Sequence, residues 1–499
     1  MSLSRLDDIQ KKIIDESPDA GSILIAGPPG SGKSLVAMEW SKELAAKNQV
    51  PVTLIMFNNV LASFCSQQEG MGGQVSVTTM LRWLNTWIAE GFEFDVPYIA
   101  RFKPDWTELT HCFRKLPDEM LRGTSWGCLI IDEGQDFPEE MYSFFGELVG
   151  RYLSLNEACL LVVLADDNQT IFDGHTNLID IQVALVCTAE QKRFWRLDTN
   201  YRNAKEIYAL AKYFQTRGTG STQSPARVAK NKPHAVFYTD KTQFAATYIC
   251  QLSRAMALPA SGDRPKIGVI SMGGISDVVS WFKTIKKLMP DEPNAPILQA
   301  YVSDRESGLN SADSLDFCTS PSITVLHAQS SKGLEFDVVV IVDLETNEGF
   351  LDDSSVALSK SLYVMLSRAK YFLFLGIKYE FGSLPKALSL LPADGHPEDL
   401  LVYKIDNALV EDGLKSIEWS NDSETTAQEI EKAKSLAIKL QAMNDSQITD
   451  LLESKLFGLR NSSQKLIFLD RLNGNADDLV DFVREIGVKT LDQHLSKYS

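Results

Sequence analysis

The chain has 499 residues, of which 44% are hydrophobic and 23% are charged. This composition is typical of a soluble globular protein and excludes global disorder, and the length favours two or three domains. The 66 acidic residues outnumber the 49 basic ones, which gives a formal net charge of −17. Any polyanion that the chain binds must therefore meet a local basic patch, because the overall field is repulsive.

The seven cysteines are an odd number, include no Cys-x-x-Cys pair and lie mostly in apolar runs. This pattern predicts free thiols in a reducing compartment and argues against structural zinc. The first thirty residues contain no apolar signal segment, and no apolar run approaches the ~18 residues of a membrane span. We therefore expect a cytoplasmic protein that does not contact a membrane.

Short apolar runs alternate with helical stretches over the first two hundred residues. Continuous apolar runs of this length suit parallel strands that are buried on both faces. The expected strands are SILIAG from Ser22, VTLIMF from Val52, CLIIDE from Cys128 and LLVVLA from Leu160. They predict a first α/β domain, which we place at residues 1–203.

After the polar stretch from Arg217 to Pro225 the same pattern begins again. The expected strands are AVFYT from Ala235, KIGVIS from Lys266, ITVLHA from Ile323, DVVVIVDL from Asp337 and YFLFLG from Tyr371. They predict a second α/β domain over residues 204–390. From about Thr425 apolar residues recur at helical spacing, so residues 391–499 are expected to form an acidic helical C-terminal region.

The strongest local motif is GPPGSGKS, from Gly27 to Ser34, which follows the strand SILIA and precedes the helical stretch LVAMEWSKELAAK. In this context the backbone at Gly27, Gly30 and Gly32 can present N–H groups to a triphosphate at a helix N-terminus. Lys33 can reach the β- and γ-phosphates, and Ser34 can bind Mg²⁺. The alternative is a glycine-rich turn with a surface lysine, but the strand before and the helix after favour a site for ATP and Mg²⁺.

A second motif, CLIIDEGQD, places Asp132 and Glu133 at the end of an expected strand. An aspartate at the carboxyl edge of a sheet, beside a P-loop, can hold Mg²⁺, and a neighbouring glutamate can orient or deprotonate a water. Alone, such an acidic pair is more often a solvated turn. Together with the P-loop it indicates nucleotide hydrolysis.

The D-E-x-Q-D motif at Asp132 to Asp136 resembles that of superfamily 1A helicases of the UvrD/Rep kind, and further matches follow in the order of that family over residues 6 to 376. The matching segments are LDDIQ, MFNNVLA, SVTTM, LADDNQTIF, TNYRN, SSKGLEFD and YVMLSRAK. The resemblance implies an α/β fold with two RecA-like P-loop NTPase domains, each with a parallel sheet. It also implies an ATP-dependent DNA helicase with 3′→5′ polarity.

The resemblance also implies roles at the nucleotide. Gln10 and Tyr201 would contact adenine, and Glu335 would contact the ribose. The residues implied at the γ-phosphate are Gln169, Arg202 and Arg368, with Arg202 as the arginine finger. Each arginine taken singly is more often part of a surface ion pair, but their places in the ordered series favour the catalytic role.

For nucleic acid, the resemblance implies that Phe57, Asn58 and Thr79 contact a single strand or a junction between single strand and duplex. Phe57, Phe172 and Trp83 are candidates for base stacking, although an aromatic residue beside a buried strand is as often part of the core. Whether the strand is DNA or RNA stays open at this point, because recognition of the 2′-hydroxyl depends on individual contacts.

The sequence departs from the family pattern at several places. Leu35 stands where an arginine is common, His327 and Gln329 replace a Thr-x-His element, and Gly174 lies near the usual place of a tryptophan. Only about fifty residues separate KIGVIS from ITVLHA, where the family carries a large insertion. We therefore expect a compact form that lacks the large accessory domains.

Three functions are compatible with these observations. The first is a translocase or helicase on single-stranded DNA. The second is a subunit that senses ATP or DNA ends and gates a partner such as a nuclease through its acidic C-terminal region, because compact UvrD-like proteins of this size resemble the helicase subunit of Gabija-type phage-defence systems. The third, a scaffold with a dead ATP site, is disfavoured because the residues expected at the phosphates are all intact.

Overall fold

The computed structural model describes residues 6–47, 50–68, 71, 73–166, 176–214, 225, 232–256, 258, 263–289, 292, 295–302, 309–347, 355–379, 390–392 and 399–405. Both large sheets belong to one compact unit, residues 1–394 with 398–411. A separate unit, residues 395–397 with 412–499, lies outside the described residues, and so does the helical region expected from Thr425.

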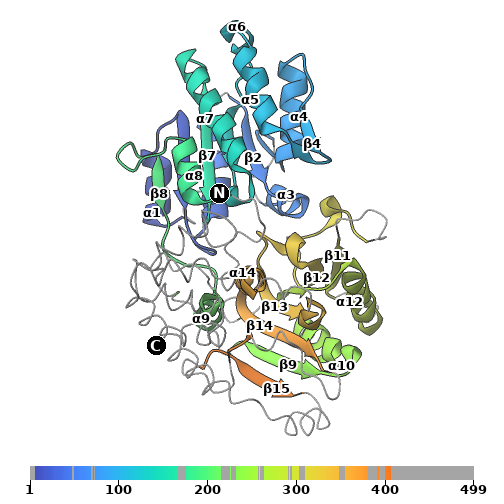
Figure 1. Cartoon of the computed structure of the whole chain (residues 1–499). Coiled ribbons are helices and arrows are strands. Elements are labelled where there is room, and N and C mark those ends of the chain that lie inside the picture. Colours follow the sequence, from blue (N-terminus) through green and yellow to red (C-terminus); the bar gives the residue numbers. More distant parts are fainter. Residues whose placement is uncertain are drawn as a thin grey trace, which may run out of the picture. The chain divides into compact units, whose positions relative to one another are not determined.

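The first sheet has six parallel strands in the order β3-β2-β6-β7-β1-β8 (Figure 1). These strands are β1 (Gly21–Ala26), β2 (Val52–Met56), β3 (Val75–Thr79), β6 (Gly127–Ile131), β7 (Cys159–Ala165) and β8 (Phe194–Arg196). All residues of β1, β2, β6 and β7 are buried, as parallel strands covered by helices on both faces require. We call this sheet with its helices the first lobe.

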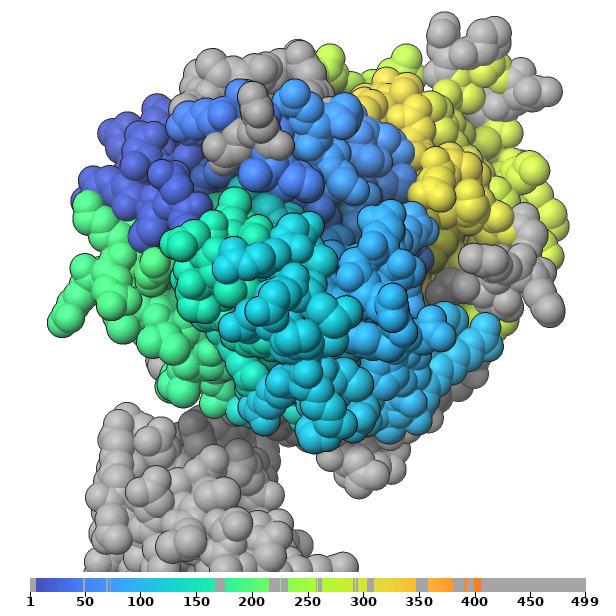
Figure 2. All heavy atoms as spheres, turned by 90° about the horizontal axis from the view of Figure 1, so that it is seen from above, coloured from blue at the N-terminus to red at the C-terminus, as the bar shows by residue number. Residues whose placement is uncertain are grey.

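The helices of the first lobe are α1 (Asp8–Glu16), α2 (Lys33–Lys47), α3 (Asn59–Ser66), α4 (Met80–Gly91), α5 (Trp106–Lys115), α6 (Asp118–Leu121), α7 (Glu139–Ser154) and α8 (Leu178–Ala184). A short hairpin of β4 (Tyr98–Ala100) and β5 (Lys103–Pro104) precedes α5. The segment from α4 to α7 forms much of the surface seen in Figure 2, where it is light blue to teal.

An aromatic core lies beneath α4, α5 and α7. Trp83 stacks on Trp87 with ring centroids 5.2 Å apart, and Trp87 stacks on Phe113 at 5.5 Å. Trp83 also meets Trp126 and Phe145. Because Trp83 is buried among these rings, its surroundings favour the core role over base stacking.

The second sheet has seven parallel strands in the order β11-β12-β10-β13-β14-β9-β15. They are β9 (His234–Tyr238), β10 (Lys266–Ser271), β11 (Ile297–Tyr301), β12 (Ser322–His327), β13 (Phe336–Val342), β14 (Ala369–Lys378) and β15 (Val402–Ile405). The helices are α9 (Lys205–Tyr213), α10 (Lys241–Ala245), a π-helical stretch (Ala246–Gln251), α11 (Leu252–Ala255), α12 (Ile275–Leu288) and α14 (Ser355–Leu366). We call this sheet with its helices the second lobe.

The fold is the predicted α/β class with two parallel sheets, and all the strands expected from apolar runs are present. The strands that we did not expect include β3, β8, β11 and β15, which are the edge strands of the two sheets. An edge strand has only one neighbour and need not be continuously apolar. The assignment of everything after residue 390 to a helical region is wrong at β15, because Val402–Ile405 pairs with β9.

None of the seven cysteines, which all lie in the described part of the chain, forms a disulfide, and five of them are buried. Within the described part of the chain, no helix combines the length and the apolar character that a membrane span needs.

Candidate nucleotide site

The P-loop connects β1 to α2 and depends on two glycines in left-handed backbone conformations. Gly30 has φ +78° and Gly32 has φ +86°, which side chains other than glycine rarely adopt. A Cβ atom at Gly30 would lie 2.7 Å from Asn200 Oδ1, and one at Gly32 would collide with the Gln10 side-chain amide. The loop therefore packs closely against both α1 and the segment that follows β8.

The start of α2 and the end of β6 bring three predicted site residues together. Lys33 Nζ donates to the carbonyl oxygens of Gly27 (2.6 Å) and Pro28 (3.1 Å) and lies 3.7 Å from Asp166 Oδ2. Ser34 Oγ donates to Asp132 Oδ2 at 2.6 Å. Lys33, Ser34 and Asp132 thus lie at the carboxyl edge of the first sheet, where ligands of open α/β sheets bind.

The Ser34 and Asp132 pair fits a Mg²⁺ ion. Asp132 Oδ1 is buried and has no hydrogen-bond partner among the described residues, and a buried oxygen in this state is costly unless a ligand satisfies it. Mg²⁺ takes oxygen ligands, and the Ser34 hydroxyl lies beside the carboxylate. Burial raises the pKa of Asp132 to about 6, and the neighbouring Glu133 charge contributes to the rise.

Glu133 is held in a defined orientation beside Asp132. Its backbone is left-handed, with φ +54°. Its carboxylate accepts a hydrogen bond from Gln135 Nε2 at 2.6 Å, and Gln135 Oε1 in turn accepts from the Asp166 N–H at 2.9 Å. Burial opposes ionisation of Glu133, but the charges of Lys332, Lys33 and Arg368 outweigh burial and lower its pKa. The group is therefore an ionised carboxylate that can orient a water.

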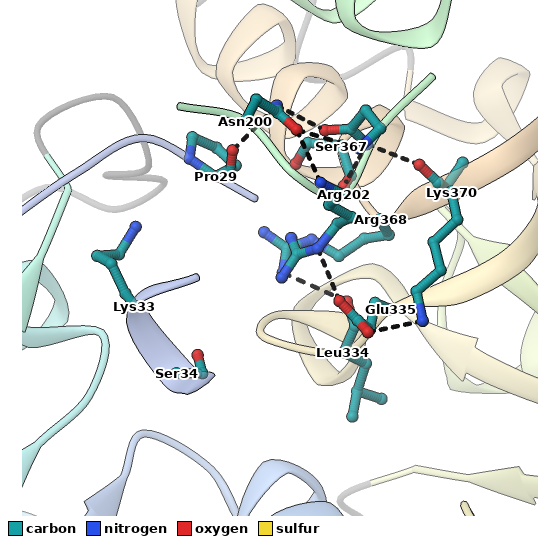
Figure 3. A network of polar contacts seen from close by, with 12 residues as sticks. Pro29, Lys33, Ser34, Asn200, Arg202, Leu334, Glu335, Ser367, Arg368 and Lys370 are labelled. Carbon is teal, nitrogen blue, oxygen red and sulfur yellow. Dashed lines mark hydrogen bonds and ion pairs between the residues drawn. The ribbon is translucent and has the colours of Figure 1, made fainter. Parts of the chain in front are cut away.

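Two arginines from other parts of the chain extend toward the P-loop. Arg202 lies between β8 and α9, and Arg368 lies in the turn between α14 and β14. In Figure 3 both guanidinium groups extend toward the side on which Lys33 and Ser34 lie. The structure thus brings together the predicted phosphate-binding residues of the first lobe and both predicted arginines.

Polar contacts hold the two arginines in place. Arg202 Nε donates to Glu335 Oε2 at 2.9 Å, and Lys370 Nζ lies 2.6 Å from Glu335 Oε1. Arg368 is only 1% exposed and donates through Nε to the Val364 carbonyl at 2.9 Å. Burial lowers the pKa of Arg368 to about 10, and the nearby Arg202 charge acts in the same direction. Arg368 therefore keeps its positive charge at neutral pH.

Glu335, which we expected at the ribose, forms ion pairs with two basic side chains, Arg202 and Lys370. Burial opposes ionisation of its carboxyl group, but Arg202 and Lys370 outweigh burial and lower its pKa to about 2. One carboxylate oxygen contacts each cation. The observed contacts of Glu335 therefore orient Arg202.

The expected adenine contacts, Gln10 and Tyr201, lie beside the P-loop. Gln10 is buried, and its Nε2 donates to the Ser31 carbonyl at 3.0 Å. Tyr201 is 45% exposed, its N–H donates to the Gly30 carbonyl at 2.8 Å, and its hydroxyl donates to Asp7. An exposed aromatic ring is thus held next to a phosphate-binding loop.

The expected nucleic-acid contacts within the described residues lie at the carboxyl ends of β2 and β3 in the first lobe. Phe57 packs edge-on against Phe137 with centroids 6.0 Å apart, and Asn58 caps α3 by accepting from the Leu61 N–H at 2.8 Å. Thr79 precedes α4 without a side-chain cap. Phe57 and Asn58 therefore have structural contacts of their own. Gln169 and Phe172 lie outside the described residues.

We assigned no individual role to four buried polar residues at this site: Asp136, Asn200, Asn203 and Lys332. Lys332 of the second lobe forms an ion pair with Asp136 of the first, and their side chains are 2% and 0% exposed. Each of the four lies inside a motif that was recognised, directly beside or close to an assigned residue. Their membership of these motifs was the available signal, but the sequence did not show which residues they contact.

No protein-family model matches the chain, and no curated protein matches it either. Similar solved structures include the C-terminal domain of a possible DNA helicase from Lactobacillus plantarum WCFS1, with 18% identity, a TM-score of 0.27, and 42% of this chain and 99% of that chain covered. Another is the Pif1 helicase from Candida albicans, with 14% identity, a TM-score of 0.38, and 74% of this chain and 94% of that chain covered. Likenesses this low support no conclusion about activity.

Proposed function

We propose that the protein is an ATP-driven translocase or helicase on single-stranded DNA that hydrolyses ATP between its two lobes. The observation that carries this proposal is the approach of Arg202 and Arg368 to Lys33, Ser34, Asp132 and Glu133. The proposed domains are residues 1–203 and 204–390, with a C-terminal region over 391–499. The ordered motif resemblance supports the UvrD-like type and the 3′→5′ polarity.

Each residue has a distinct part in the proposed reaction. Lys33 and the P-loop amides bind the phosphates, and Ser34 and Asp132 would hold Mg²⁺, which neutralises phosphate charge. Glu133, fixed by Gln135, orients the attacking water and accepts its proton. Two guanidinium groups complete the cationic surroundings of the transferred phosphoryl group, and an arginine in this role contributes roughly 10³–10⁵ in turnover.

Translocation requires that the nucleotide state changes the spacing of the strand contacts. We place these contacts at Phe57, Asn58, Thr79 and Phe172. Asn58 Nδ2 lies 3.5 Å from the Lys332 carbonyl oxygen of the second lobe, so movement of one lobe against the other changes the surroundings of this segment. Closure with ATP and opening after hydrolysis would then advance the strand.

The test is ATP hydrolysis with and without single-stranded DNA, with duplex and RNA as further arms. We expect single strands to stimulate turnover and Lys33→Ala to abolish it, because the phosphates lose their charge partner. Lys47→Ala is the matched control: it removes a lysine from the same helix, but one whose side chain is 65% exposed, and such surface pairs contribute little. A rate of ATP hydrolysis that no nucleic acid changes would contradict the proposal. Duplexes with a single-stranded tail at one end or the other test the polarity.

A further inference from the structure

The segment from Asn200 to Ala204 is bound to the P-loop on one of its sides. Asn200 Nδ2 donates to the Pro29 carbonyl at 3.2 Å, and the Tyr201 N–H donates to the Gly30 carbonyl at 2.8 Å. Gly30 has no room for a Cβ atom because Asn200 Oδ1 and Arg202 Cβ lie too close. The segment is therefore packed against the part of the P-loop that precedes Lys33.

The same segment is bound on its other side to the turn that carries Arg368. Asn203 Nδ2 donates to the carbonyl oxygens of Ser367 at 3.0 Å and Ala369 at 2.6 Å, which flank Arg368. The Ala204 N–H donates to the Lys370 carbonyl at 2.9 Å. Three carbonyl groups near Arg368, those of Ser367, Ala369 and Lys370, are thus held by two residues of the segment.

A direct bond between the two asparagines connects these two sides. Asn200 Nδ2 donates to Asn203 Oδ1 at 2.9 Å, and Asn200 Oδ1 accepts from the N–H groups of Arg202 (3.0 Å) and Asn203 (3.1 Å). Asn200 is 3% exposed and Asn203 is 1% exposed. Each side-chain amide uses both of its donors and its acceptor, so the pair is a fully satisfied buried network, which makes it rigid.

We propose that Asn200 and Asn203 are positioning residues that form a relay between the P-loop and the Arg368 turn. The relay sets the distance between the first lobe's phosphate-binding loop and both arginines, because Arg202 lies between the two asparagines and Arg368 between the two carbonyls that Asn203 binds. This inference rests on the proposed ATP hydrolysis. It assigns the two amides no contact with the nucleotide.

Loss of the relay is expected to slow ATP hydrolysis without weakening ADP binding, which a general structural role would not predict. ADP lacks the γ-phosphoryl group on which the arginines act, and its expected contacts are the P-loop, the ribose contact Glu335 and the adenine contacts Gln10 and Tyr201. A displacement of the arginines by about 1 Å costs on the order of 10²-fold in rate, yet it leaves ADP binding unchanged. Loss of the relay therefore affects the transition state selectively.

The experiment compares the full-length protein with Asn203→Ala and Asn203→Asp. The first variant removes the whole amide; the second keeps its volume and the acceptor for Asn200 but places an oxygen against two carbonyl groups. We expect ADP affinity within about twofold of wild type, turnover at saturating ATP lower by about 10²-fold, and affinity for ADP with aluminium fluoride lower by at least about tenfold. Asn310→Ala is the control, because its Oδ1 accepts the backbone N–H of Ala300 at 3.1 Å, a contact that lies outside the relay.

A variant that loses ADP and ADP–aluminium fluoride binding to the same extent, or that keeps normal turnover, overturns the relay. If Asn203→Ala does not fold, Asn203→Asp gives the same comparison with less loss of volume. Failure of the proposed function is distinguishable: the wild-type protein would then not hydrolyse ATP at all. Wild-type hydrolysis that the Asn203 variants leave intact contradicts the relay alone.

Discussion

At the residue scale, the ion pair between Lys332 and Asp136 is the contact whose loss we expect to cost most. Both side chains are almost fully buried. In Lys332→Met the Asp136 carboxylate loses its ion-pair partner, although the charge of Arg368 still acts on it, and it must either stay buried as an ion or take up a proton. Removal of one partner of a buried pair typically costs about 3–5 kcal/mol, and we expect a decrease of this size in the free energy of unfolding, measured by urea denaturation.

The double variant Lys332→Met with Asp136→Asn removes both charges but keeps side chains of similar volume. It therefore separates the effect of the charges from the effect of packing. It should regain most of the lost stability, because neither position of the pair then carries a charge. Lys192→Met is the control, since Lys192 and Glu16 form a surface pair with side chains 54% and 36% exposed, and such pairs are worth at most about 1 kcal/mol. Equal effects of Lys332→Met and Lys192→Met would show that the buried pair does not form in solution.

These residues also mark how far the sequence predicts the site. Lys33, Ser34 and Asp132 could be placed together because strand ends of a parallel sheet share one edge. Lys332 and Asp136 are 196 positions apart, and nothing in a sequence with 49 basic residues says which one pairs with Asp136. The same holds for Asn203, whose partners are backbone carbonyls that any residue could supply.

At the scale of elements, the start of β9 contains a histidine that must stay neutral. His234 Nδ1 is buried and has no hydrogen-bond partner among the described residues, and its ring meets that of Phe374 on β14 at 5.6 Å. Burial lowers the pKa of His234 to about 4, and the charge of Lys404 on β15 contributes. The unfolded chain, with a histidine pKa near 6.5, takes up a proton at a higher pH than the folded chain does.

The sign of the pH effect follows from this difference. As the pH falls from about 6.5 to about 4, His234 takes up a proton in the unfolded state but stays neutral in the folded state. The free energy of unfolding therefore decreases. We expect the free energy of unfolding of the wild type to fall more steeply across this range than that of His234→Gln. Replacement of the exposed His111 by Gln should leave the wild-type slope unchanged; if His234→Gln also leaves it unchanged, His234 is not buried in a neutral form.

The strands themselves were predictable to different degrees. The central strands could be read from apolar runs such as LLVVLA and DVVVIVDL, because burial on both faces leaves little room for polar residues. The edge strands β3 (VSVTT) and β11 (ILQAY) mix polar and apolar residues. Their state depends on pairing with β2 and β12, which their own sequences do not encode.

At the scale of the whole molecule, β15 decides where the chain can be shortened. A chain that ends at Glu411 keeps β15 and all the residues that we place at the nucleotide. We expect it to fold and to hydrolyse ATP at a rate close to that of the full-length protein. A chain that ends at Pro397 lacks β15 and exposes the outer edge of β9, so we expect a lower thermal midpoint and aggregation.

Thermal denaturation and ATP hydrolysis on both truncated chains test this expectation. Loss of hydrolysis in the chain that ends at Glu411, with its thermal midpoint unchanged, would show that residues 412–499 take part in the reaction. Hydrolysis that survives while a cellular function is lost would favour the reading in which the C-terminal region contacts a protein partner.

The position of β9 between β14 and β15 also has a consequence for synthesis of the chain. His234 of β9 is in register with Phe374 of β14, which comes 374 − 234 = 140 residues later, and with Val402 of β15. At ~5–20 residues per second, the ribosome needs on the order of ten seconds to supply either neighbour. During that interval an apolar strand with two unpaired edges is exposed to solvent, so a nascent-chain chaperone that shields residues 234–238 would be needed more here than at β10 or β13.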